Sequence, residues 1–173
     1  RGVECLGGCP RAARQCVQRG EMSNRLAQAT VVARLAGQKG RAILTAKNHH
    51  VVVDSPLTLG GPNEELNPID MLFGALATHV IFVCERAAQE NGCALSGAVA
   101  RVVGAFDPHT GQDPAAVPYL QSLSVDVRLA GPTEEQAAIF RAAIGSRCLM
   151  YTTLARAVPI ALDLDIEPVT NPT

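Results

Sequence analysis

The chain has 173 residues and a mass of 18.2 kDa, a size typical of one globular domain. Apolar residues make up 47% of the sequence and charged residues 18%, so it can bury a core and is not a disordered tail. The 15 lysines and arginines are balanced by 16 aspartates and glutamates, which argues against a nucleic-acid partner, because phosphate recognition needs an excess of basic side chains.

The first 21 residues differ from the rest of the chain. They hold three of the six cysteines and four arginines, and they lack the apolar stretch of a secretory signal. The C-x3-C-x6-C spacing also lacks the closely paired ligands of a zinc module. We therefore expect residues 1–21 to be a disordered or non-native extension and residues 22–173 to form a single domain. Without an export signal, we expect a cytoplasmic protein with reduced thiols.

Short segments rich in β-branched residues follow the extension. They predict strands over residues 25–35, 41–44 and 49–53, with a turn at 36–40 and a loop at 54–66.

The clearest helix signal covers residues 68–89. Asn67 is a favourable N-cap, Pro68 suits the first helical position, and Asn91-Gly92 is a usual C-terminal signal. The longest apolar run, 71–84, is shorter than the roughly 20 residues that cross a bilayer, so we expect no membrane partner. Apolar side chains cover nearly every face, which predicts a central helix buried between a sheet and a second subunit.

The second half of the chain predicts two strands, two helices and a last strand, with Ser146 as the cap of the second helix. In order, these elements cover residues 94–105, 120–129, 134–144, 147–156 and 158–166. The full order β-β-β-α-β-β-α-α-β groups the strands in runs, which predicts an α+β fold.

Taken together, these motifs resemble the OsmC/Ohr family of thiol-dependent hydroperoxide reductases over roughly residues 25 to 166. The resemblance is carried by Asp54 after its strand, Gly60-Gly61, Asn67-Pro68 with the apolar run, Asn91-Gly92, and Cys148 before the last short helix. It implies antiparallel sheets wrapped around a long central helix in an intertwined homodimer, with the sites at the subunit interface.

The resemblance also implies two catalytic cysteines. The second, which resolves the oxidised intermediate, matches Cys148. The first, which attacks the peroxide, lies eleven residues after the proline in the family, and here that position is His79. His79 is either a base or metal ligand facing Cys148, or a buried imidazole bonded to a backbone carbonyl. Cys148 is either a thiolate favoured by a helix start and by Arg147, or a small buried apolar residue.

Family members also pair an arginine with a glutamate. The glutamate matches Glu64, the arginine position is Gln38, and Arg41 or Lys39 is the alternative source of charge. The resemblance makes Gln38 and Arg41, together with the helix residues Leu76 and Phe73, the expected substrate-binding residues.

The other cysteines and histidines have structural interpretations. Cys84 points to a different helix face from the reactive position, and Cys93 follows a turn. His49 and His50 are adjacent in a strand, so they point to opposite faces and do not chelate one metal, and His109 lies in a Pro/Gly loop.

Three functions stay open. The first is thiol-based reduction of organic hydroperoxides without a cofactor, impaired by His79 and carried by Cys148 with an external thiol reductant. The second is a non-catalytic dimer that binds a small apolar ligand. The third is a metal or hydrolytic site formed by His79, Cys148 and Glu64. The separation between His79 and Cys148 is the observation on which the choice depends.

Overall fold

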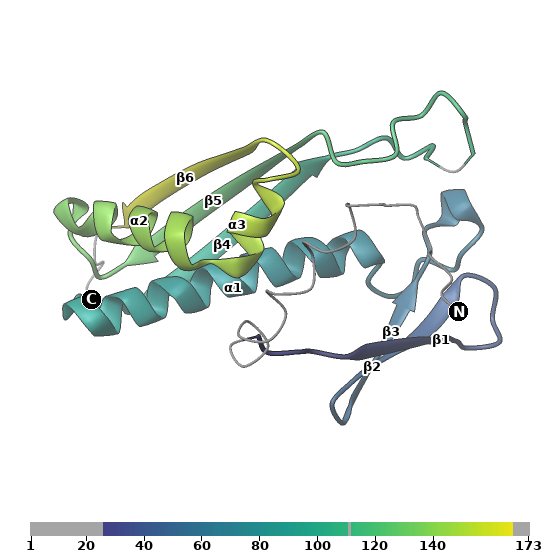
Figure 1. Cartoon of the computed structure of the whole chain (residues 1–173), viewed down its shortest axis with the longest axis horizontal. Helices are drawn as coiled ribbons and strands as arrows, with labels where there is room; N and C mark the ends of the chain where they lie inside the picture. The colour runs from purple at the N-terminus through teal and green to yellow at the C-terminus, as the bar shows by residue number, and fades with distance from the viewer. Residues whose placement is uncertain (1–25, 111, 168–173) are drawn as a thin grey trace, which may run out of the picture.

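A computed structural model describes residues 26–110 and 112–167 (Figure 1). Within these ranges the helices and strands follow the predicted order, with two additional 3₁₀ turns, Leu57–Leu59 and Glu134–Gln136. The α+β class is confirmed. The predicted extension, residues 1–21, lies outside the described residues.

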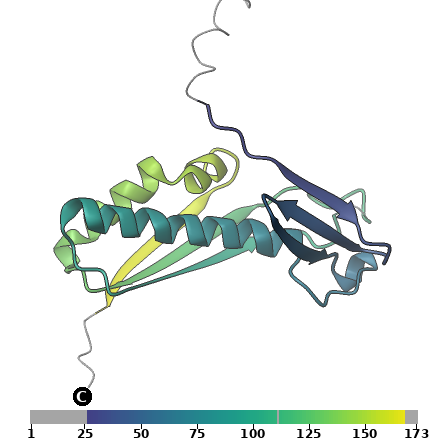
Figure 2. The ribbon, with the colours of Figure 1, turned by 90° about the horizontal axis from the view of Figure 1, so that it is seen from below.

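The first three strands form an antiparallel meander, sheet A. Its strands are β1 (Val31–Leu35), β2 (Arg41–Ala46) and β3 (His49–Asp54), in that order. Figures 1 and 2 both show sheet A at one end of the long helix, separate from the second sheet. The prediction placed the start of the first strand at residue 25, but β1 begins where Val31 meets its first partner, Ala46.

The long helix α1 (Pro68–Asn91) begins where the sequence predicts and ends two residues after the predicted end at residue 89. The Asn67 side chain accepts hydrogen bonds from the backbone N–H groups of Ile69 and Asp70, and the Asp70 carboxylate accepts one from Asn67 N–H in return. Gly92 ends the helix in the left-handed conformation (φ 62°).

The burial of α1 differs from the prediction. Its fully buried residues form one stripe, namely Leu76, Val80, Cys84, Ala87 and Ala88. Other apolar side chains of the helix are exposed in the single chain, Phe82 by 63%. A single chain therefore does not bury every face of α1, and the second subunit that would cover the rest stays a prediction.

Among the described residues, α1 is the one helix long and apolar enough to cross a membrane by length and composition. Its buried stripe and its contacts with β4, α2 and α3 are those of a core helix in a folded domain.

The second sheet, sheet B, contains β4 (Gly97–Ala105), β5 (Ser122–Ala130) and β6 (Ile160–Glu167). β4 and β5 are antiparallel, as expected, whereas β5 and β6 are parallel. The parallel pairing arises because α2 (Ala137–Arg147) and α3 (Leu149–Leu154) form the crossover that parallel strands require.

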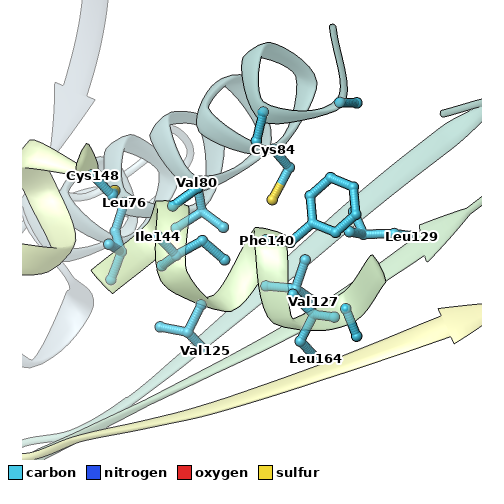
Figure 3. Close-up of a cluster of buried hydrophobic side chains, with 14 of the residues drawn as sticks. Leu76, Val80, Cys84, Val125, Val127, Leu129, Phe140, Ile144, Cys148 and Leu164 are labelled. Atoms are coloured by element: carbon cyan, nitrogen blue, oxygen red, sulfur yellow. The ribbon is translucent and has the colours of Figure 1, made fainter. Parts of the chain in front are cut away.

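The core lies between α1, α2 and sheet B. Figure 3 shows side chains of α1 facing Phe140 and Ile144 of α2. Alternate residues of β5 complete the cluster, namely Leu123, Val125, Val127 and Leu129. This packing holds the middle of α1 against the junction of α2 and α3.

Candidate functional site

His79 and Cys148 lie in direct contact. His79 comes from the middle of α1 and Cys148 from the junction between α2 and α3, and His79 Nδ1 lies 3.2 Å from Cys148 Sγ. The sequence left two interpretations of His79 open, and the structure has the one in which the imidazole faces Cys148. The partner of the imidazole is thus a thiol rather than the backbone carbonyl of the alternative interpretation.

Cys148 is the N-cap of α3. Its backbone leaves the helical conformation (φ −76°, ψ 99°), and its Sγ accepts a hydrogen bond from Tyr151 N–H at 3.4 Å. The prediction that Ser146 caps this helix is wrong, because α2 continues through Arg147 and the Ser146 hydroxyl donates to the Ala142 carbonyl oxygen inside α2.

Burial dominates the protonation of Cys148. The residue has an exposed fraction of 0%, and burial raises the pKa of its thiol, opposed by hydrogen bonds from the backbone of Tyr151 and Met150. Arg147, expected to add positive charge beside the sulfur, instead pairs with Glu90. In this state the thiol form is therefore favoured over the thiolate form that the helix start predicted.

An open pocket of about 200 Å³ lies beside the imidazole. It is lined by His79, Phe82, Val83, Arg86, Arg147 and Leu149. The pocket combines an apolar wall with two guanidinium groups, and of the His79–Cys148 pair only His79 lines it.

A second polar group is centred on Arg41. Its Nε and Nη2 atoms donate to the two carboxylate oxygens of Asp54, each at 2.8 Å. Nη2 also donates to Glu64 Oε2 at 2.7 Å, and Nη1 donates to Gln38 Oε1 at 3.0 Å. Of the two cations offered by the sequence for Glu64, Arg41 is therefore the one that pairs with it.

Asp54 is a site residue that the sequence analysis used only as a motif position. It is 1% exposed, and its Oδ2 atom also accepts the backbone N–H groups of Glu64 and Glu65 at 3.0 and 3.1 Å. The bonds from Arg41 lower the pKa of Asp54 to about 2. The pairing of β2 with β3 sets Arg41 directly opposite Asp54. A basic residue at the start and an acidic residue at the end of a predicted hairpin is therefore a sequence pattern from which this ion pair can be predicted.

The remaining candidates lie elsewhere. Leu76 is fully buried in the core, and Phe73 packs against it, so neither lines the pocket. Gln38, Arg41 and Glu64 form one group and His79 and Cys148 another, and no hydrogen bond within the described residues joins the two groups.

The described residues offer no metal site. Over residues 26–110 and 112–167, no three side chains of His, Cys, Asp or Glu converge as a metal site would require.

The other cysteines and histidines fit their structural interpretations. Cys84 is buried in the core and Cys93 is half-buried. His49 and His50 are exposed, and His109 sits in its loop beside Asp107.

Comparisons with known proteins agree with this architecture. The family profile described as "OsmC-like protein" matches residues 61–163. No curated protein sequence matches the chain significantly.

Solved structures resemble the chain at low sequence identity. The OsmC-like protein from Mycoplasma pneumoniae has a TM-score of 0.68 at 14% identity, covering 81% of this chain and 97% of that one. The organic hydroperoxide resistance protein OsmC from Legionella pneumophila has a TM-score of 0.63 at 14% identity, covering 81% and 98%. The organic hydroperoxide resistance protein from Elizabethkingia anophelis has a TM-score of 0.62 at 14% identity, covering 82% and 98%.

These likenesses show a shared fold, and the profile covers well over half of the sequence. The chain belongs to the OsmC-like family.

Proposed function

We propose that this chain is a homodimeric protein that reduces organic hydroperoxides through one cysteine, Cys148, assisted by His79. The observation that carries the proposal is the 3.2 Å contact between His79 Nδ1 and Cys148 Sγ beside an open pocket. A thiol next to an imidazole is a recurrent arrangement for an activated sulfur nucleophile.

The role of His79 is to overcome the raised pKa of Cys148. The imidazole takes the thiol proton as the sulfur attacks, so a free thiolate does not have to persist in the buried site. His79 thereby replaces the first cysteine of the family as a base and not as a second sulfur.

One catalytic cycle consumes one hydroperoxide and two external thiols. The sulfur of Cys148 attacks the terminal peroxide oxygen, the O–O bond breaks, and the alkoxide leaves as an alcohol with the proton held by His79. The resulting sulfenic acid condenses with one external thiol to a mixed disulfide and water. A second external thiol then releases Cys148 as a thiol and leaves as a disulfide. The cycle needs reduced thiols, so we assign it to the cytoplasm.

The Arg41 group completes the site in this proposal when a second copy brings it to the pocket. Arg41 is already oriented by both oxygens of Asp54, and its contact with Glu64 leaves that carboxylate largely exposed (68%). An oriented guanidinium stabilises the negative charge that develops on the leaving oxygen.

The decisive experiment measures consumption of cumene hydroperoxide with 2-mercaptoethanol as reductant. The rate of peroxide consumption by Cys148→Ser should equal the uncatalysed rate. The rate of His79→Ala should be roughly 100-fold below that of the wild type, the usual contribution of a positioned acid–base group. Cys93→Ser is the matched control and should keep the wild-type rate, because Cys93 is half-buried away from the pocket. Equal rates for the wild type and Cys148→Ser would overturn the proposal.

A gain of function provides a second test. His79→Cys places two sulfur atoms across the same contact, and the resolving step then becomes intramolecular. We expect faster turnover and a disulfide between residues 79 and 148, detectable as a loss of two mass units after one equivalent of peroxide.

A non-catalytic ligand-binding dimer is the second candidate. The complete burial of Cys148 and its raised pKa favour this function. This function predicts that cumene hydroperoxide does not oxidise Cys148, so that the mass of the wild-type protein stays unchanged. The catalytic proposal predicts a sulfenic acid at Cys148, which dimedone traps.

A further inference from the structure

We propose that Glu90 is a positioning residue for Cys148: it holds the guanidinium of Arg147 away from the sulfur, and release of Arg147 from Glu90 favours the thiolate. The control of thiol ionisation rests on the Glu90–Arg147 ion pair alone, whereas its effect on peroxide turnover rests on the proposed function.

Arg147 is the chain neighbour of the reactive sulfur. It is the last residue of α2, and Cys148 follows it as the N-cap of α3. The side chains on both sides of Cys148, those of Arg147 and Leu149, line the same pocket as His79. Because consecutive Cα atoms lie only about 3.8 Å apart, the long side chain of Arg147 has the reach to place its guanidinium beside the His79–Cys148 contact.

In this structure the guanidinium is turned to a different partner. Arg147 Nη1 donates to Glu90 Oε2, which joins the C-terminal end of α2 to that of α1. The groups that oppose the raised pKa of Cys148 are the backbone N–H groups of Tyr151 and Met150, and Arg147 is not one of them. The ion pair with Glu90 therefore keeps a neighbouring cation from acting on the thiol.

Glu90 is an unfavourable residue for its place in α1. It lies in the last turn of the helix, where the partial negative charge of the helix end disfavours a carboxylate and favours a cation. α1 has no basic residue in that turn. A residue that conflicts with its local position indicates a role outside its own helix. For Glu90 the contact outside the helix is the ion pair with Arg147.

The titratable and charged groups around Cys148 come from three helices. They are His79, Cys84 and Arg86 on α1, Arg147 on α2 and Tyr151 on α3. β5 turns aliphatic side chains toward the same core. Of these groups Arg147 is the one that Glu90 holds, so removal of the Glu90 carboxylate changes the charge near the sulfur through Arg147.

The test titrates the thiol of Cys148 in the full chain. The ultraviolet absorbance of the thiolate is recorded against pH for each variant and for the same variant carrying Cys148→Ser, so that the difference reports one thiol. Glu90→Gln frees Arg147, and a guanidinium near a buried sulfur stabilises the thiolate. We expect the midpoint of the titration to fall by about one pH unit, a roughly 10-fold increase in the thiolate fraction at neutral pH.

Three further variants show whether Arg147 carries the effect. In an Arg147→Gln background, Glu90→Gln should leave the midpoint unchanged, because no guanidinium is left to release. Glu90→Asp keeps a carboxylate for the ion pair and should keep the wild-type midpoint. Glu85→Gln, which removes another exposed carboxylate from α1, is the matched control and should also keep the wild-type midpoint.

The outcomes separate this inference from the proposed function. An unchanged midpoint in Glu90→Gln overturns the inference. An equal fall with and without Arg147 also overturns it, because Glu90 would then act through its own charge. If the midpoint falls through Arg147 but no variant consumes cumene hydroperoxide, the control of the thiol stands and the proposed peroxidase function fails. If Cys148 carries peroxide consumption and the midpoint does not move, the proposed function stands and this inference fails.

Discussion

At the scale of single residues, Asp54 orients Arg41. Asp54 accepts two guanidinium bonds at 2.8 Å and two backbone N–H groups, so both of its oxygens are bonded inside the chain. Glu64 lies on the outer side of the same guanidinium and is exposed. Arg41 therefore pairs with two different carboxylates, one buried and one exposed.

Because of this ion pair, we expect the free energy of unfolding to decrease at acidic pH. The pKa of Asp54 is lowered from 3.8 to about 2, so its stabilisation is complete above pH 4 and is lost as the pH falls toward 2. Asp54→Asn should be less stable than the wild type near neutral pH, and the deficit should shrink between pH 4 and 2 in urea-unfolding curves. Asp163→Asn, at an exposed position on β6, is the control. A deficit for Asp54→Asn that stays constant with pH would contradict the assignment.

Cys84 gives the opposite dependence on pH. Burial, with a smaller contribution from Cys148, raises the pKa of its thiol from 9.0 to about 11. The unfolded chain therefore loses this proton first, and the stabilisation present below pH 9 is lost as the pH rises toward 11, by about 1.4 kcal/mol per unit. The stability difference between the wild type and Cys84→Ala should narrow at this rate in urea unfolding. Val80→Ala, one turn away and equally buried, should show no such narrowing.

At the scale of elements, two glycines let the Arg41 loop approach the loop after β3. A Cβ atom on Gly61 would lie 2.1 Å from the Ser55 carbonyl oxygen, and one on Gly40 would lie 2.5 Å from Gly61 Cα. Gly40 also has a φ of 73°, which other residues adopt at a cost. Gly40 and Gly61 are therefore required for close packing of the backbone next to the Arg41 group.

Gly61→Ala should accordingly destabilise the fold by about 1–3 kcal/mol, the usual effect of overpacking. Gly97→Ala is the matched control, because a Cβ atom there meets only Ala130 Cβ at 3.6 Å, and it should change stability by less than about 0.5 kcal/mol. Urea midpoints of the two variants test the difference. Similar midpoints would show that the Ser55 backbone moves freely.

The elements also show what the sequence can predict. The predicted start of α1 is correct and its predicted end is two residues short, because Asn67, Pro68 and Gly92 act through local backbone bonds. The early part of the first predicted strand is wrong because pairing is not local: β2 has no residue left to pair with the chain before Val31.

The candidate site was predictable in part. His79 and Cys148 are 69 residues apart, so no local pattern joins them, and only the family resemblance predicted their contact. The burial of Cys148, the end of α2 and the pairing of Arg147 with Glu90 depend on tertiary packing, which no single segment of the sequence encodes.

At the scale of the whole molecule, sheet A has one largely apolar face, with His49 at its edge. Residues directly opposed in an antiparallel pair share a face, and the register gathers aliphatic side chains on one side of the sheet. They are Val31, Ala33, Leu35, Ala42, Leu44, Ala46, Val51 and Val53. Leu35 is 86% exposed and Val31 is 55% exposed in the single chain. A small sheet with such a face needs a partner surface, and the exposed side of α1 in a second copy would provide one.

The expected dimer can be tested with neighbouring residues of β1. Val31→Glu places a charge on the apolar face and should shift the protein from dimer to monomer in analytical ultracentrifugation. Val32→Glu, on the opposite face of the same strand, should stay dimeric. A wild-type protein that sediments as a monomer would contradict the expectation.

The cap formed by Cys148 has a mechanical consequence. Its sulfur holds the first turn of α3 through Tyr151 N–H, and its exposed fraction is 0%. Adding an oxygen atom to a fully buried sulfur requires its surroundings to move, and α3, with six residues, is the shorter of the two helices that meet at Cys148. Each oxidation of this thiol would therefore shift α3 and, with it, the exposed Leu149 that lines the pocket.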